Sequence, residues 1–114
     1  MNEMMKKTNE KIVIENNYGV KIEFEGRKTG NGTSYIEGDK HWNEIDIYQT
    51  VSGNYIGVWT FIEYRKVKDV SVYISNNADD LFDSMTWQWE CLTRHVKDAF
   101  NDAFRESGFM FVEV

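Results

Sequence analysis

Apolar and polar residues alternate along the first two thirds of the chain, which is the period of β-strands with one buried face. Short strands are predicted at 11–15 and 20–25, a brief one at 35–37, and another at 67–75. In the last of these, Tyr73 points away from the face of the valines. Successive strands leave no room for a crossover helix, so the pattern predicts an antiparallel meander.

The strongest strand signal is a central hairpin, with arms at 44–51 and 54–62. A two-residue turn at Ser52-Gly53 would place Ile47 opposite Val58. The hairpin then has an aliphatic face, which we expect to carry a helix: Ile45, Ile47, Ile56, Val58 and Ile62. Its other face is aromatic and is continued by Tyr73 of the next strand: Tyr48, Tyr55, Trp59 and Phe61.

Residues 26–34 form the one long glycine-rich segment. The glycines at 26, 30 and 32 do not match a phosphate-binding loop, because no Gly-Lys-Ser/Thr closes the segment and no helical pattern follows it. Since glycine often marks turns, we interpret 26–34 as a mobile loop between strands.

The period changes to that of a helix between residues 78 and 107, with Asn77 as N-cap and Gly108 as the stop signal. A helix of this length would overhang the sheet, so we expect an overhang or a break, and place any break near Asp83-Ser84. Residues 109–114 are apolar on both sides. They are predicted to form a strand that joins the sheet or pairs with the edge of a second copy to make a homodimer.

These elements predict one α+β domain over residues 11–114, after a flexible N-terminus at 1–10. The domain is an antiparallel meander of five to six strands with a long, possibly broken amphipathic helix on one face and a short final strand.

The excess of acidic over basic residues makes some classes of binding partner less favourable. The net charge is −6, and the pI is near 4.9. Duplex DNA and anionic membranes attract basic surfaces, so both are disfavoured as direct partners. The single cysteine, Cys91, excludes an internal disulfide, and no signal peptide or membrane span is evident. We therefore expect a cytoplasmic protein. The absence of proline and the frequent Asn, Lys and Ile are typical of an AT-rich bacterial or phage genome.

No motif of catalysis or metal binding stands out. His41 and His95 lack the spacing of a zinc site, so no metal or cofactor is expected. His41 has acidic neighbours, among them Asp39, Glu44 and Asp46. Without a second catalytic element we interpret this segment as a solvated loop, and Cys91 as a small packing residue. We expect a protein that is not an enzyme.

The predicted helical region is acidic, and one of its tryptophans lies outside the apolar stripe. Trp87 points away from the apolar stripe, so it either lies beneath the N-terminal segment or belongs to an interface. Seven carboxylates outnumber three basic residues between 78 and 107. The residues predicted to bind a partner are Asp80, Asp83, Trp87, Glu90, Asp98 and Asp102.

The leading hypothesis is therefore a small acidic protein-binding module, and in its sharpest form a phage or mobile-element inhibitor of a bacterial defence or nucleic-acid-processing complex, as anti-CRISPR proteins are. Its carboxylates would occupy a basic nucleic-acid channel. An immunity protein or antitoxin would have the same features. The alternative from another class is a small-ligand or single-stranded RNA binder that uses the aromatic face, namely Tyr48, Tyr55, Trp59, Phe61 and Tyr73.

Overall fold

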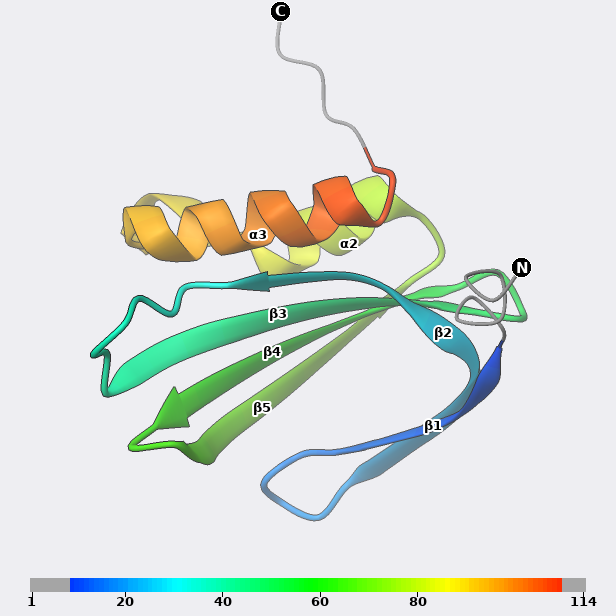
Figure 1. Ribbon diagram of the computed structural model, residues 1–114. Helices are drawn as coiled ribbons and strands as arrows, with labels where there is room; N and C mark the ends of the chain where they lie inside the picture. The colour runs from blue at the N-terminus through cyan, green and yellow to red at the C-terminus, as the bar shows by residue number, and fades with distance from the viewer. Residues whose placement is uncertain (1–8, 110–114) are drawn as a thin grey trace, which may run out of the picture.

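The computed structural model describes residues 9–109. Within this range the chain forms an antiparallel sheet that curls into half of a barrel, with helices packed against one side (Figure 1). The strands lie in the sheet in chain order: β1 (Glu10–Glu15), β2 (Lys21–Thr33), β3 (His41–Thr50), β4 (Tyr55–Glu63) and β5 (Lys66–Ser75). The predicted α+β class and the antiparallel meander are confirmed.

The helical region is broken, as one of the two expectations had it, but later than Asp83-Ser84. It consists of α2 (Ala78–Met85), a short 3-10 helix η1 (Trp89–Cys91) and α3 (Arg94–Glu106). Asn77 caps α2, because its side-chain oxygen accepts from the Asp80 N–H at 2.8 Å. The α2 helix ends where the hydroxyl of Thr86 donates to the carbonyl of Phe82 at 2.6 Å. Thr93 then caps α3, a second start signal.

The predicted stop at Gly108 is confirmed in detail. Gly108 has a φ of +88° and its N–H donates to the carbonyl of Arg105, while the N–H of Phe109 donates to the carbonyl of Phe104. This is the Schellman pattern. The rings of Phe104 and Phe109, with centroids 6.1 Å apart, form the apolar contact that usually accompanies it. Beyond Phe109, the strand predicted at 109–114 and its homodimer contact lie outside the described residues.

The glycine-rich segment is not a loop, and this prediction was wrong. Residues 26–33 are the second half of β2, paired with β3, while 35–37 belong to the connection that follows. The glycines serve the packing of α3. A Cβ on Gly32 would overlap the main-chain carbonyl of Ala99, and one on Gly30 would overlap that of Ala103. Glycine therefore lets the helix backbone lie directly on the strand.

The end of β2 is tied to the end of α3 by polar contacts. The N–H of Asn31 donates to the Glu106 carboxylate at 2.7 Å. A bulge lies between Lys28 and Gly30, and the hydroxyl of Thr29 within it donates to Ser107 Oγ at 3.0 Å. These contacts fix the position of α3 over β2 and β3.

The register of the central hairpin differs from the prediction by one residue. Ile47 pairs with Gly57 and not with Val58. The loop contains three residues, 51–53, because Gly53 has a φ of +95° and follows a turn closed by its N–H to Thr50. Gly at the last position of a three-residue loop favours a turn with a bulge, whereas a two-residue loop would put Ser52 at positive φ.

This shift exchanges the two faces of β4. Tyr55, Trp59 and Phe61 lie on the helix-facing side of the sheet with Ile45 and Ile47. The opposite face carries Ile56 and Val58, which are 3% and 5% exposed. The prediction of one aliphatic and one aromatic face was therefore wrong. The core between the sheet and the helices contains both aliphatic and aromatic residues. Its buried residues are Ile45, Ile47, Leu81, Met85, Val96, Ala99, Phe100, Ala103 and Phe104.

The turn from β4 to β5 has an unfavourable backbone conformation, and a glycine substitution should remove its cost. Tyr64 and Arg65 have φ values of +52° and +66°, a region that glycine adopts more readily than L-residues with a side chain. We expect Arg65→Gly to stabilise the protein by about 1 kcal/mol, because Arg65 is exposed and its left-handed conformation costs this much. Urea unfolding measures the effect. Arg105→Gly, in the last turn of α3, is the comparison and is expected to destabilise; equal losses in both variants would contradict the prediction.

Candidate functional site

Trp87 lies between α2 and η1 and is 75% exposed. The described residues leave it uncovered, so it does not lie beneath a neighbouring segment within them. An exposed tryptophan is a large apolar group in contact with water, and such groups often serve as anchors in protein interfaces.

The carboxylates predicted with Trp87 lie on both helices and on the segment between them, all exposed. Asp80 and Asp83 lie on α2, Glu90 on η1, and Asp98 and Asp102 on α3. The helices lie side by side over the sheet (Figure 1), and the rings of Phe82 and Phe104 meet at 5.0 Å between them. We call Trp87 and these five carboxylates the acidic helical surface.

Some of these carboxylates already have partners. Asp80 accepts from the side chain of Asn77 at 2.9 Å, and Asp102 pairs with Arg105 at 3.0 Å. Within residues 9–109, Asp83, Glu90 and Asp98 make no ion pair. They are the carboxylates most available to a basic partner.

The five aromatic residues of the alternative site do not form one face. Trp59, Phe61 and Tyr73 lie together on the helix-facing side of the sheet, around a hollow of about 270 Å³ that Asn43, Asp69 and Ser71 also line. Tyr55 is on the same side but packs edge-on against Phe109, with ring centroids 5.0 Å apart. Tyr48 lies on the opposite face.

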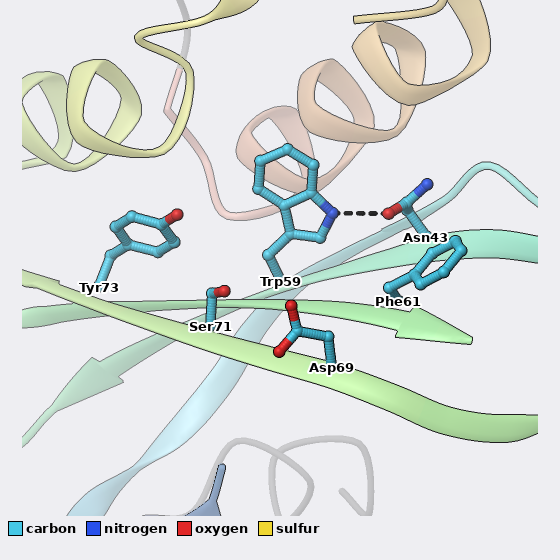
Figure 2. Close-up of a pocket in the computed structure, with 6 residues that line it drawn as sticks. All are labelled: Asn43, Trp59, Phe61, Asp69, Ser71 and Tyr73. Atoms are coloured by element: carbon cyan, nitrogen blue, oxygen red, sulfur yellow. Dashed lines mark hydrogen bonds between the residues drawn. The ribbon is translucent and has the colours of Figure 1, made fainter. Parts of the chain in front are cut away.

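Figure 2 shows the side chains around the hollow. Trp59 stands between Tyr73 and Phe61, and its indole N–H donates to the Asn43 side-chain oxygen at 2.7 Å. The Trp59 ring also packs edge-on with Phe100, with ring centroids 5.0 Å apart. Asp69 and Ser71 rise from β5 at the foot of Trp59. The tryptophan is therefore held by both a hydrogen bond and core packing.

Tyr48 belongs to a separate cluster. Its ring meets Phe24 edge-on at 5.6 Å, and the Lys28 ammonium lies 5.8 Å from its centroid. Burial raises the pKa of the Tyr48 phenol, although Lys28 opposes this. Burial acts to lower the pKa of Lys28, but Asp46, 3.2 Å away, and nearby groups outweigh it and raise the pKa overall. Lys28 therefore stays charged beside Tyr48.

The acidic residues near His41 are not brought together with it. His41 Nδ1 lies 3.4 Å from Glu63 instead. Glu44 accepts from the indole of Trp42 at 3.0 Å, Asp46 pairs with Lys28, and Asp39 accepts from the Ile36 N–H. Among residues 9–109 no group of three His, Cys, Asp or Glu residues could hold a metal ion. Cys91 is exposed, which contradicts its interpretation as a packing residue.

Sequence reasoning singled out Trp87, which the structure shows to be exposed, but it missed the polar side of the hollow. The alternation of β5 already places Asp69 and Ser71 on the side of Tyr73, so this signal was available. Asn43 joins them only through the register of β3 and β4.

No protein-family model, curated protein or solved structure matches the chain. Within residues 9–109, each helix is too short or too polar to cross a membrane.

Proposed function

We propose that the protein is a non-enzymatic binding module whose acidic helical surface occupies a basic surface on a protein partner. The observation that carries this proposal is the exposure of Trp87, at 75%, within a segment, 78–93, that has four carboxylates and no lysine or arginine. A solvated connection between two helices gains no stability from an exposed indole ring. At an interface, the ring supplies apolar contact area while the carboxylates around it select the partner by charge.

The free carboxylates support a partner with clustered Lys and Arg residues. Asp83 precedes Trp87 by four residues and Glu90 follows it by three, and neither pairs with a described residue. Charge complementarity of this kind speeds association and excludes acidic partners. Basic surfaces of this kind line the channels that hold nucleic acids.

In its specific form, the proposal is an inhibitor of a bacterial defence or nucleic-acid-processing complex. Carboxylates that fill a nucleic-acid channel compete with phosphate for the same basic side chains. The AT-rich residue usage, with no proline in 114 residues, fits a phage or mobile-element origin.

The test compares partner capture from a bacterial lysate by the wild type and by a variant of the acidic helical surface, Asp83→Lys/Trp87→Ala/Glu90→Lys. We expect the variant to lose the captured protein by at least about tenfold, because it removes the anchor and reverses two charges. Mass spectrometry quantifies the capture. A single-stranded oligonucleotide should release the partner from the wild type, since both occupy one basic surface.

The matched control makes the same kind of change on the β1–β2 hairpin: Glu15→Lys/Tyr18→Ala/Glu25→Lys. Tyr18 is 84% exposed, and both carboxylates are exposed. The control therefore removes an exposed aromatic ring and changes the net charge equally. Retained capture by the first variant, or equal loss in both, would place the contact elsewhere and refute the proposal.

A further inference from the structure

The hollow over β4 and β5 is lined by aromatic side chains and by a negatively charged carboxylate, as a ligand site for a cation would be. Three aromatic side chains, Trp59, Phe61 and Tyr73, form its walls, and Asp69 is the one ionised group among the lining residues that the structure describes. No lysine or arginine is among its described lining residues. Lys68, next to Asp69 in sequence, has its ammonium 3.9 Å from Glu63. The hollow therefore disfavours anions and favours a cation.

Apart from the side-chain oxygen of Asn43, the polar side-chain groups at the hollow make no hydrogen bond or ion pair with the described residues. Within residues 9–109, the Asp69 carboxylate and the hydroxyls of Ser71 and Tyr73 make no side-chain hydrogen bond or ion pair. The Asn43 amide is held by Trp59 through its oxygen, which leaves its N–H groups unpaired. The carboxylate and hydroxyls together present several acceptors beside an aromatic ring (Figure 2).

We propose that this hollow binds a guanidinium group, stacked against Trp59 and paired with Asp69. A guanidinium is planar and cationic, so it lies well on an indole face, and its five N–H donors match a carboxylate and nearby hydroxyls. A quaternary ammonium has no N–H to donate, and a sugar would leave the carboxylate without a counter-charge. A nucleotide would bring phosphate to a site without a basic residue.

The site is preorganised for this role. The hydrogen bond to Asn43 and the edge contact with Phe100 hold the Trp59 ring in place before any ligand arrives. The antiparallel pairing of Phe61 with Asp69 and of Trp59 with Ser71 sets the aromatic and polar groups on neighbouring strands. Binding therefore requires little ordering of the site itself, which preserves affinity for a small ligand.

The guanidinium has two sources with the same chemistry, a free small molecule or an arginine of a protein partner. The proposal stands apart from the acidic helical surface, because no residue of that set lines the hollow. Failure of either proposal leaves the other in place.

The test follows the indole N–H of Trp59 by NMR, with Trp59→Phe used to assign the resonance, while N-acetyl-arginine amide is added. We expect a saturable shift with a dissociation constant on the order of 1 mM, the range of a ligand this small. N-acetyl-citrulline amide has nearly the same shape without the charge, so it should produce no saturable shift.

Asp69→Asn is the decisive variant, because Asp69 is exposed and its side chain makes no contact that the fold needs. It should weaken binding of the arginine compound by about tenfold, the expected loss of a charge-assisted pair. Asp83→Asn, an equal change away from the hollow, should leave binding unchanged. Equal shifts with citrulline, or undiminished binding to Asp69→Asn, would overturn the proposal.

The source is decided by repeating the lysate capture with Asp69→Asn. Loss of the captured protein together with loss of the arginine compound assigns the guanidinium to the partner. Retained capture with loss of the arginine compound assigns it to a free small molecule. Both results support the site, whereas a wild type that shows no saturable shift refutes it, whatever the capture shows.

Discussion

Gly32→Ala should lower the free energy of unfolding by about 3 kcal/mol or more. The added Cβ would overlap the carbonyl oxygen, carbonyl carbon and Cα of Ala99, all main-chain atoms of α3. Around Gly32 the strand is paired with β3, and its neighbour Asn31 is hydrogen-bonded to Glu106 of α3. Neither this strand nor a helix backbone can shift cheaply, so the cost lies at or above the upper end for overpacking. In a strand without such a neighbour, the same change would stabilise by reducing backbone freedom in the unfolded state.

Urea unfolding followed by circular dichroism measures this loss, and Gly57→Ala is its control. A Cβ on Gly57 would meet the Sδ and Cε of Met85, the flexible end of a side chain. Methionine can change rotamer, so we expect a loss of only about 1 kcal/mol. Equal effects of the two substitutions would mean that α3 does not lie against β2 through its backbone.

The second large effect is expected for Phe100→Ala, with a loss of about 3–5 kcal/mol. Phe100 is fully buried in the middle of α3 and touches the ring of Trp59 edge-on. Removing it leaves a cavity between the helix and the sheet and withdraws the support of Trp59. The tryptophan emission of the folded variant should therefore shift towards that of a more solvated indole.

Asn101→Ala is the control for this change, since it lies next to Phe100 in α3 but is exposed. Its effect should fall within about 0.5 kcal/mol of zero, as for most surface positions. If Phe100→Ala cost no more than the control, α3 would not be seated on the sheet through this residue.

Local signals in the sequence were sufficient for the architecture. The alternation of β1 and β5 and the capping residues Asn77 and Gly108 each act over a few neighbouring residues, and each prediction based on them is confirmed. The α+β class follows from the same signals. Strands and helix ends of this kind are specified by the residue types of a few neighbouring positions, so they can be predicted without the tertiary structure.

The wrong predictions for the glycine-rich segment and for the hairpin register depended on contacts that sequence neighbours do not reveal. Gly30 and Gly32 resemble loop residues until α3 is placed on them. The length of the loop at Gly53 differed by one residue, which was enough to move Trp59 to the opposite face. Consequently the hollow beside Trp59 could not be assembled from the sequence. Trp87 was singled out because it lay off the predicted apolar stripe, although the structure places it between α2 and η1 and not in a helix.

The polar contacts between the end of β2 and the end of α3 also bear on how the chain folds. Each hairpin of the meander joins neighbouring segments, but the hydrogen bond from Asn31 to Glu106 connects residues 75 positions apart. Closing so long a loop costs more entropy than closing a hairpin, and distant contacts form slowly for this reason. We therefore expect the sheet to form before α3 docks on the glycines of β2.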